Sequence, residues 1–551
     1  MLLRTFVTGL LLSAGAFAQM ASFPKPSYFR EVFKQTNTRV ELRDPVRLKD
    51  FVVGGKLELS LKNYTELVMA NNTQVQISFI SLEIPKNNIV SAFGKFDPTA
   101  TASFSSQRST TVPTSPATSG SASLGSISKS LNQPFSASYT QALDTGMSYT
   151  VSMGGAKSSF SNSRSTYNPS LTSSMSFSVT QNLIQNRGRY VNRLPIMIAE
   201  SSYKKSAYNL RATLLSTINA AENVYWNVIS ARENLKVQEQ NRTNNESNLK
   251  FVQQQLDLGA IAMLDIYNPE GNLAAAEFAV SQAKFRLASA EDALRQQISA
   301  DLDPDIAKLP IELTEPVDLA PGEVLPLDTA QAVQKAMAAN PAVLSAIQQM
   351  DVDELGIQTA KNGLLPQLSF TATYSGAGQG GTYIPSQSNL TLVGAAEPIP
   401  GGLSDALAQM LGLNNPTYFG RLSLTLPIRS RTASMAMADS LVTKKTDALN
   451  LRNTQQTIRL QTLNAVTNLQ GFVEQLKLAN QQAEIQQKNY EAEQEKYTLG
   501  TDTNQNVVIA LTNLVTAQSN VVTAKVALRT GILAVLTNTG ELLDARGIVV
   551  K

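Results

Sequence analysis

The residue types that most often do chemistry in proteins are missing from this sequence. Its 551 residues include no Cys and no His. Disulfides, thiolate or imidazole metal sites and Ser-His-Asp triads are therefore excluded. No convergent carboxylate motif replaces them, so we assign no catalytic residue, no cofactor and no metal site. We expect a protein that is not an enzyme.

The charge balance does not indicate a nucleic-acid partner. Lys and Arg together number 46 and Asp and Glu 43, which gives a net charge of +3. Binding to nucleic acid depends on a clear basic excess that neutralises phosphates. We therefore expect no nucleic-acid partner.

The polar residues that stand out lie in two similar turns, each headed by a glycine. Gly259 opens the sequence GAIAMLD, and Gly500 opens GTDTNQN. Glycine most readily adopts the positive φ that such turns need. The remaining positions of interest in these turns are Ala260 and Asp265 in the first and Thr501, Asp502 and Asn506 in the second.

Each turn leads into a helix pattern with the same alternation of large and small residues. The spacings alternate between three and four, which predicts the packed face of an amphipathic helix. Small residues in such a stripe allow neighbouring helices to approach closely. The stripe, or helix-barrel seam, consists of Leu273, Ala276, Val280, Ala283 and Leu287 in the first helix and Leu514, Ala517, Val521, Ala524 and Leu528 in the second. A duplicated turn and stripe indicate two internal repeats.

The positions of Pro, Gly and capping residues set the boundaries of these repeats. We expect the first repeat at 57–302, with strands at 99–108 and 171–181, a long helix at 196–258 and a return helix at 264–300. We expect the second repeat at 327–540, with strands at 367–375 and 418–428, a long helix at 432–499 and a return helix at 503–537. A Pro-rich linker at 303–326 separates them, and a C-terminal tail covers 541–551.

The N-terminus has the layout of a signal peptide. Arg4 supplies the charge, Phe6–Leu12 the apolar region and Ala16–Ala18 the small-residue site, so we expect a signal peptide at 1–18 and an N-terminal arm at 19–56. Beyond residue 19 no uninterrupted apolar run reaches about 18 residues, the length of a membrane helix.

The expected strands alternate between polar and apolar residues but are too polar for the core of a soluble sandwich. They fit a wall that has lipid on one face and water on the other. Residues 135–153 resemble a further hairpin around Asp144–Gly146. The number of wall strands per chain therefore stays open at four or six.

This order of elements resembles the TolC-type outer-membrane efflux family over about residues 57–540. The family's signature after each strand is only partly present, because Gln181–Leu183 lacks its Pro and Leu426–Ile428 lacks its Gln. The resemblance implies an α+β membrane protein: a homotrimer with a β-barrel in the outer membrane, of twelve strands at four per chain, continuous with a long periplasmic α-helical barrel.

The resemblance also implies a function and partners. The trimer would be the passive exit duct of a tripartite efflux or type I secretion system. It would contact outer-membrane lipid, a periplasmic adaptor (membrane fusion) protein and, through the adaptor, an inner-membrane pump or secretion ATPase. The turn residues Gly259, Ala260, Gly500 and Thr501 would face the adaptor.

Family resemblance further assigns a gate to the periplasmic tip. In the best-known member, a Tyr three residues before the second glycine bonds to an Asp six residues after the first; Tyr497 and Asp265 match this pair. An Arg two residues after the second glycine adds a link there, but this chain has Asp502, which would repel Asp265. Asn506 replaces the second turn's Asp. The alternative is that Asp265 is an ordinary helix cap and Tyr497 an ordinary packing residue.

Two other classes of protein remain alternatives. An exported trimeric coiled-coil adhesin or stalk would explain the heptad spacing and the Ser-rich loops, but it would not explain a block of strands inside each repeat. A periplasmic adaptor would carry one helical hairpin rather than two equivalent halves.

Overall fold

The computed structural model describes residues 48–111, 128–161, 167–259, 261–300, 306–318, 328–383 and 399–548. The predicted signal peptide, most of the predicted arm and Ala260 lie outside these ranges. Everything described below belongs to one compact unit, Asp44–Lys551.

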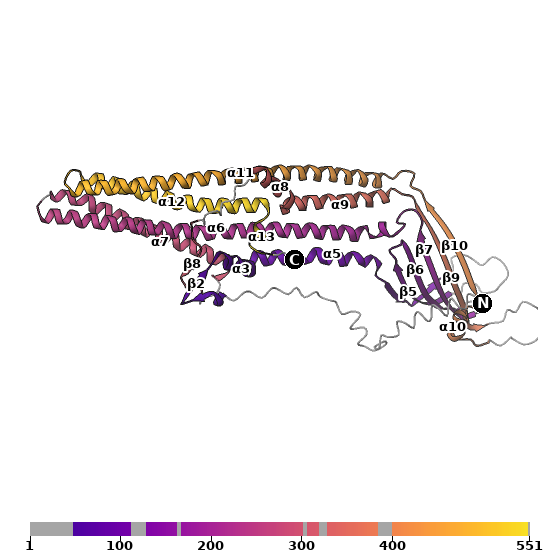
Figure 1. The fold of residues 1–551 in the computed structure, drawn as a ribbon. Helices are drawn as coiled ribbons and strands as arrows, with labels where there is room; N and C mark the ends of the chain where they lie inside the picture. Colours follow the sequence, from indigo (N-terminus) through magenta and orange to yellow (C-terminus); the bar gives the residue numbers. More distant parts are fainter. Residues whose placement is uncertain are drawn as a thin grey trace, which may run out of the picture. The chain divides into compact units, whose positions relative to one another are not determined.

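Four long helices dominate this unit, two from each half of the sequence (Figure 1). They are α6 (Arg189–Asp257), α7 (Tyr267–Gln297), α11 (Arg431–Thr498) and α12 (Asn504–Thr539). The α6 helix packs against α7, α11 against α12, and α12 against α6. The short 3₁₀ helix η4 (Met263–Ile266) precedes α7. The first long helix starts earlier than the predicted residue 196, because α6 continues through Pro195, which costs only one backbone hydrogen bond near its start.

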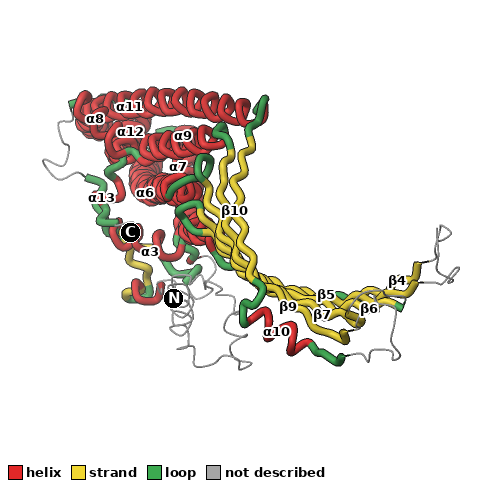
Figure 2. The backbone as a smooth tube through the Cα atoms, turned by 90° about the vertical axis from the view of Figure 1, so that its right-hand side faces the viewer, coloured by secondary structure: helices red, strands yellow, loops and turns green. Residues whose placement is uncertain are grey.

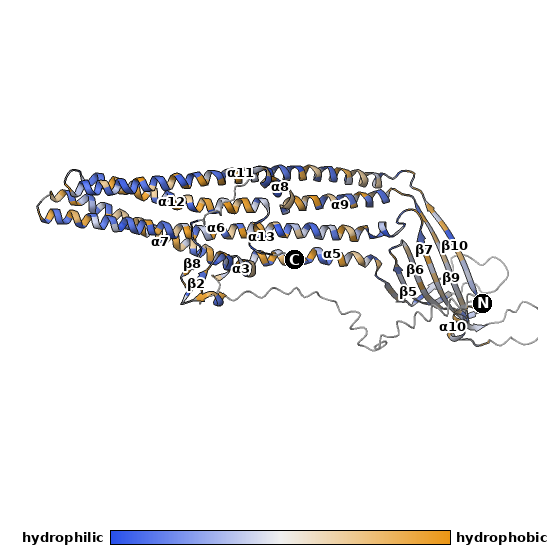
Figure 3. Ribbon diagram, in the orientation of Figure 1, coloured by the Kyte–Doolittle hydropathy of each residue, from blue (hydrophilic) through white to orange (hydrophobic). Residues whose placement is uncertain are grey.

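Shorter helices precede the strands in each half. The first half has α3 (Leu61–Asn71), α4 (Thr73–Ser81), α5 (Glu83–Phe93) and the 3₁₀ helix η3 (Gly94–Phe96), and the second has α8 (Thr329–Ala339) and α9 (Pro341–Gly363). Ser60 caps α3, because its hydroxyl accepts a hydrogen bond from the Asn63 N–H at 3.2 Å. In Figure 3 hydrophilic stretches run along α6 and α11 between the apolar positions that pack.

Two asparagines make matching contacts in the two halves. Asn72 and Asn340 each cap the helix that follows, with their Oδ1 atoms 2.9 Å and 3.0 Å from the backbone nitrogens that they bind. Their Nδ2 atoms each donate to a carbonyl near the end of a return helix, that of Gln297 and that of Asn538, both at 3.0 Å. One side chain thus joins three helix ends in each half.

The strands form one antiparallel sheet of seven among the described residues, in the order β10-β9-β7-β6-β5-β3, with β4 also paired to β5. They are β3 (Thr99–Phe104), β4 (Gln107–Thr111), β5 (Ser128–Ala142), β6 (Met147–Phe160), β7 (Tyr167–Asn182), β9 (Gln367–Tyr383) and β10 (Pro416–Thr425). Since β3 and β4 share one neighbour, the seven strands fill six positions. Pairing of β7 with β9 joins the two halves.

Two strand predictions need correction, and the predicted hairpin is confirmed. The strand expected at 99–108 is two strands, because Pro134 of β5 lies opposite the break and has no N–H to donate to the ladder. The hairpin expected at 135–153 belongs to the sheet and is longer, as β5 and β6. The strand expected to end at residue 375 continues to Tyr383 through a Gly-rich stretch.

The two faces of the sheet differ in polarity. One face carries hydroxyl pairs across neighbouring strands, including Ser152 with Ser176 at 2.6 Å and Ser178 with Thr373 at 3.0 Å. The opposite face carries a row in register formed by Ala100, Tyr139, Val151, Phe177, Tyr374 and Tyr418. We call these the hydroxyl face and the apolar face. The helix α10 (Leu403–Leu411) packs on β9 and β7 (Figure 2).

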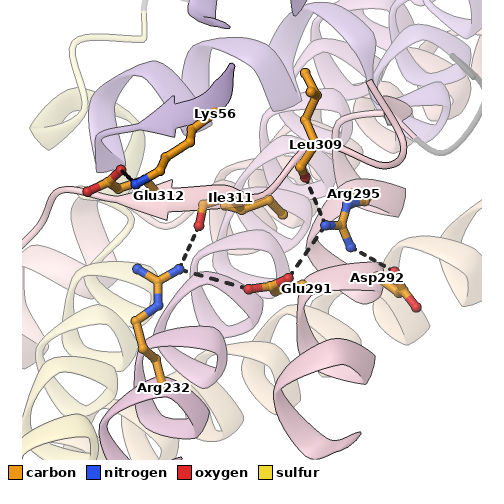
Figure 4. Close-up of polar contacts among 8 residues, drawn as sticks. All are labelled: Lys56, Arg232, Glu291, Asp292, Arg295, Leu309, Ile311 and Glu312. Atoms are coloured by element: carbon orange, nitrogen blue, oxygen red, sulfur yellow. Dashed lines mark hydrogen bonds and ion pairs between the residues drawn. The ribbon is translucent and has the colours of Figure 1, made fainter. Parts of the chain in front are cut away.

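A second, small sheet includes part of the linker between the halves, because β8 of the linker pairs with β2. It consists of β1 (Val52–Val53), β2 (Lys56–Leu59) and β8 (Ile311–Leu313), preceded by the 3₁₀ helix η2 (Leu48–Phe51). Two arginines hold the linker backbone (Figure 4): Arg232 of α6 donates to the Ile311 carbonyl at 2.8 Å, and Arg295 of α7 donates to the Leu309 carbonyl at 3.1 Å. Lys56 and Glu312 form an ion pair at 3.1 Å on its exposed side.

The predicted C-terminal tail contains one more helix, α13 (Leu542–Ala545), which packs against α12 and α6. By length and composition, α12 is the one described helix able to cross a membrane, because an 18-residue window within it has a mean hydropathy of 1.4. It also packs against α6, α8 and α11. A core helix passes the same test, so this composition is weak evidence for a membrane span.

Candidate gate and docking site at the helix tips

The two Gly-headed turns have nearly the same geometry. Gly259 has φ of 72° and Gly500 has φ of 73°, a region that side chains other than glycine rarely adopt. Each glycine N–H binds back to a carbonyl three residues earlier, that of Leu256 at 2.8 Å and that of Tyr497 at 3.0 Å. Each turn therefore ends a long helix at a fixed point and reverses the chain.

Tyr497 takes a partner that the sequence did not suggest. Its hydroxyl donates to Oε1 of Gln255 at 2.8 Å, and its ring meets that of Phe251 edge-on with centroids 5.5 Å apart. Burial, and then the negative charge of Asp265, raise the pKa of the Tyr497 hydroxyl, so it stays a neutral donor. Within the described chain no hydrogen bond joins Tyr497 to Asp265, and that contact stays a prediction for the assembled protein.

Asp265 instead stabilises its own turn. One of its carboxylate oxygens accepts a hydrogen bond from the backbone N–H of Ala262 at 3.2 Å. Ala262 is the N-cap residue of η4, and Asp265 lies three residues later, the position from which a carboxylate reaches back to the N-cap N–H. Asp265 therefore makes an ordinary capping contact without being the N-cap itself. A capping role and a role in the gate are compatible, because a carboxylate has further acceptor sites free.

Asp502 is likewise held inside its own turn. Its Oδ1 atom accepts from the Thr503 N–H and from Nδ2 of Asn506, both at 2.6 Å. Hydrogen bonding with the Glu493 side chain, then with Thr503 and Asn506, lowers the pKa of the Asp502 carboxyl below its ordinary value. Asp502 is therefore charged at neutral pH, and the second turn presents a carboxylate where the family pattern has a cation.

A further hydrogen bond joins the first turns of the two return helices, α7 and α12. Nδ2 of Asn268 donates to Oε1 of Gln505 at 2.8 Å. Sequence reasoning missed Asn268, Gln505 and Gln255. The signal was weak, because Gln255 ends a run of three glutamines at 253–255 in which no position stands out.

Large apolar side chains are exposed around both turns. Leu258 is 83% exposed, Met263 71%, Leu264 77% and Leu499 72%. We call these four residues the tip surface. A cluster of exposed apolar side chains at the end of a charged helical hairpin is typical of a surface that meets another protein.

The seam residues lie on the packed sides of the return helices. Buried among them are Ala276, Val280, Ala283, Leu514, Ala517, Ala524 and Leu528, and half-buried are Leu273, Leu287 and Val521. In the described part of the chain no group of three or more carboxylates is placed to hold a metal ion.

Sequence comparison decides the family. The model of the outer membrane efflux protein family matches residues 146–299 and 332–541, which include most of both halves. This chain belongs to the outer membrane efflux protein family. It is therefore an outer-membrane efflux channel. The match does not support the alternative of an exported coiled-coil adhesin.

Solved structures share the fold of this efflux channel. The CmeC outer membrane channel of Campylobacter jejuni is 17% identical with a TM-score of 0.59, covering 91% of this chain and 89% of that chain. The outer-membrane channel OprN is 14% identical with a TM-score of 0.61, covering 91% and 94%. The open state of the Neisseria gonorrhoeae MtrE channel is 16% identical with a TM-score of 0.57, covering 88% and 89%. A search of curated protein sequences found no match.

Proposed function

We propose that three copies of this efflux channel close into one passive duct, with a β-barrel in the outer membrane and an α-helical barrel in the periplasm. The observation that carries this proposal is the seven-stranded sheet, which ends in β10 on one side and in β3 and β4 on the other. Unpaired strand edges are too costly in lipid, so a wall of this kind must close on itself. Neighbouring copies supply the missing partners.

The barrel has eighteen strand positions under this proposal, because each chain contributes six and there are three chains. The first half supplies the positions of β3 with β4, β5, β6 and β7, and the second supplies β9 and β10. A twelve-stranded barrel would need only four positions per chain. Since barrel diameter grows roughly linearly with strand number, the opening would be about 1.5 times as wide.

The polarity of the sheet sets its orientation in the wall. The hydroxyl face lines the water-filled lumen, and the apolar face contacts outer-membrane lipid. Aromatic residues such as Tyr374 and Tyr418, whose ring centroids lie 5.1 Å apart, stand on the apolar face. Tyrosines at the edges of a lipid-facing band are common in outer-membrane barrels.

The helical barrel closes through apolar side chains that stay exposed among the described residues of a single chain. Along α11, apolar residues remain about half exposed or more, among them Leu441 (49%), Leu449 (60%), Leu460 (58%), Leu478 (54%) and Ile485 (64%). These residues are spaced along a helix that carries mostly polar residues elsewhere. A neighbouring copy packed against α11 would remove them from water.

The internal repeats supply equivalent halves of this helical barrel. Support comes from Asn72 and Asn340, which make the same cap and the same bridge to a return helix. The similar φ angles of Gly259 and Gly500 support the same conclusion. Three chains of two repeats would give the tips near six-fold symmetry.

The tip is both the gate and the docking site for the periplasmic adaptor in this proposal. Asp265, Tyr497, Asp502 and Asn506 form the gate, which opens when neighbouring helix pairs slide apart. The tip surface and the turn residues Gly259, Gly500 and Thr501 meet the adaptor, while Ala260 lies outside the described residues. An inner-membrane pump or secretion ATPase, reached through the adaptor, supplies the energy.

Electron microscopy of the purified protein in lipid tests the architecture. We expect a trimer with a closed wall of eighteen strands, in which β10 of one copy pairs with β3 of the next. A trimer with twelve wall strands and the β5–β6 hairpin outside the wall would contradict the wide barrel. A monomer in the membrane, or a wall made from other strands, would contradict the duct itself.

A further inference from the structure

Helix α10 lies flat on the sheet instead of standing beyond its end (Figure 2). Its closest approach is over β9, where a side chain at Gly378 or Gly380 would collide with the backbone of Ala406 or Gly402. The hydroxyl of Ser173 on β7 also donates to the Ala406 carbonyl at 2.7 Å. The Gly-rich stretch of β9 is therefore the surface on which α10 packs.

Strand register identifies the face on which α10 sits. Residues directly opposite in an antiparallel pair share a face, and Ser173 lies opposite Gly378. Side chains two positions apart also share a face, so Gly378 lies on the same side as Tyr374. Tyr374 belongs to the apolar face. Helix α10 therefore covers the apolar face, and the lumen side is left to the hydroxyls.

Side-chain amides fix α10 to a part of β9 that β10 leaves unpaired. The ladder between β9 and β10 ends at Gly376 and Pro416. Beyond that point, Gln409 of α10 accepts from the Gln379 N–H at 3.2 Å and donates to the Gln379 carbonyl at 3.0 Å. Asn415 donates to the Ala377 carbonyl at 3.2 Å. These bonds satisfy backbone groups that would otherwise be open to lipid.

The sides of α10 differ in character. Ala406 and Met410 are buried against the sheet. Leu403, Leu407 and Leu411 recur every four residues and form a leucine stripe along one flank, with Leu403 43% and Leu411 66% exposed. The carboxylate of Asp405, on the other flank, accepts the Gly402 N–H at 2.7 Å and so caps the start of the helix.

The position of α10 along the wall matches the outer side of the membrane. Strand β9 begins at Gln367, directly after α9, and Gly378 lies further along it. At about 3.3 Å per residue and a tilt of roughly 40°, Gly378 lies about 28 Å from the start of the strand along the membrane normal. The apolar band of such barrels is about 25 Å tall, so α10 lies at its far edge.

We propose that α10 is an interfacial helix of the outer leaflet, with its leucine stripe embedded among lipid acyl chains. The stripe extends the exposed apolar surface that Met175 and Met153 already form on the same face. Amphipathic helices that lie in a membrane interface bury an apolar flank in this way and keep polar groups at the boundary. This inference rests on the proposed barrel, because it takes the apolar face as the lipid face.

Single cysteines offer a direct test, since the chain has none of its own. Leu411→Cys in the full-length protein is spin-labelled and reconstituted in vesicles of phosphatidylethanolamine and phosphatidylglycerol. Collision rates with oxygen, which enriches in lipid, and with a water-soluble nickel chelate are then compared. Two matched sites provide references: Leu422→Cys on the apolar face of β10 and Ala377→Cys on the hydroxyl face of β9.

We expect the Leu411 label to match the Leu422 reference, with an oxygen-to-nickel ratio several-fold above that at Ala377. A Leu411 label that matches Ala377 would place the helix in water and overturn the inference. An immobile label shielded from both reagents would mean that a neighbouring copy covers the stripe, which overturns it as well. If Leu422 itself reads as aqueous, the orientation of the wall fails, and with it the proposed barrel.

Discussion

The two halves of this efflux channel are alike where helices meet and unlike where strands meet. Both halves use an asparagine to join three helix ends and a glycine with φ near 72° to reverse the chain. The wall is divided unequally, because the first half supplies four strand positions and the second only two. A hairpin adds two antiparallel strands to a sheet, and the new edge strand runs in the same direction as the old one. The number of strands can therefore change without altering how the next chain pairs with the sheet. Packed helices have no such freedom, because each must fit its neighbours.

Each half also contacts the segment that follows the other half, but through different residues. Besides Arg232 and Arg295 of the first half, Arg529 of α12 in the second half holds the linker that follows the first half. Arg529 donates to the carbonyls of Pro316 at 3.1 Å and Asp318 at 2.9 Å. The tail that follows the second half is held by Glu222 of α6, whose carboxylate receives two hydrogen bonds from Arg546, both at 2.7 Å. Each half thus binds the segment that leaves the other.

The largest expected effect comes from breaking the contact between Arg546 and Glu222. The side chain of Glu222 is fully buried, and Arg546 is its bidentate partner. Arg546→Ala leaves a buried carboxylate without a counter-charge, which typically costs about 3–5 kcal/mol. We expect thermal unfolding of the purified protein, followed by circular dichroism, to shift to clearly lower temperature.

Two further variants distinguish the cost of leaving the Glu222 carboxylate unpaired from the cost of losing any contact with the C-terminal tail. Arg211→Ala removes the ion pair with Asp544 near the same tail, whose side chains are 31% and 68% exposed, and should cost less than about 1 kcal/mol. Glu222→Gln added to Arg546→Ala should recover much of the lost stability. If Arg546→Ala costs no more than Arg211→Ala, the tail does not brace the first half in the way described.

A smaller and equal effect is expected at the matching asparagines. Asn72→Ala and Asn340→Ala each remove a helix cap, worth about 1 kcal/mol, and a hydrogen bond to a return helix, worth about 1 kcal/mol. Ser60→Ala removes a cap alone and serves as the control. Urea unfolding should rank the two asparagine variants together and above the serine variant. A loss at only one asparagine would show that the halves are not equivalent even at their helix joints.

The helices were predictable because each end carries its own local signal. Gly259 and Gly500 end the long helices within a residue or two of the predicted points, and Ser60 and Asn340 cap helices through their side chains. The strands depend on partners far away in the sequence. The sequence near Ser105 does not predict that the strand is interrupted there, because the interruption is caused by Pro134 on the neighbouring strand β5. Gly376–Gly381 reads as a loop until the helix that needs those glycines is known.

The candidate site was predictable in part. A glycine and its fixed spacing to Asp265 and Asp502 can be read from the sequence, so the turns themselves were found. The partner of Tyr497 could not be found in this way, because Gln255 is one of three consecutive glutamines and only the packing of two helices selects it. Which of several identical neighbouring residues makes a contact with a distant part of the chain cannot be predicted from the sequence.

The smallest expected effect tests whether the two tip turns contribute unequally to the gate. Asp502→Arg puts a cation at the position where it can pair with Asp265. An exposed ion pair is worth about 0.2–1 kcal/mol, so the ratio of open to closed channels should fall by up to about fivefold. Single-channel recording in a planar bilayer measures this ratio directly.

The first turn supplies the matched control for this gate variant. Ile261 lies two residues after Gly259, as Asp502 lies two residues after Gly500, but the second turn offers Asn506 where the first has Asp265. Ile261→Arg therefore introduces the same side chain without a carboxylate at the matching position, and should leave the open-to-closed ratio nearly unchanged. Asp502→Asn removes the repulsion from Asp265 without adding a link, and should lower the ratio by less than Asp502→Arg does. Equal closure by both arginine variants would mean that added positive charge closes the tip by itself, and the proposed asymmetry between Asp265 and Asn506 would have no part in gating.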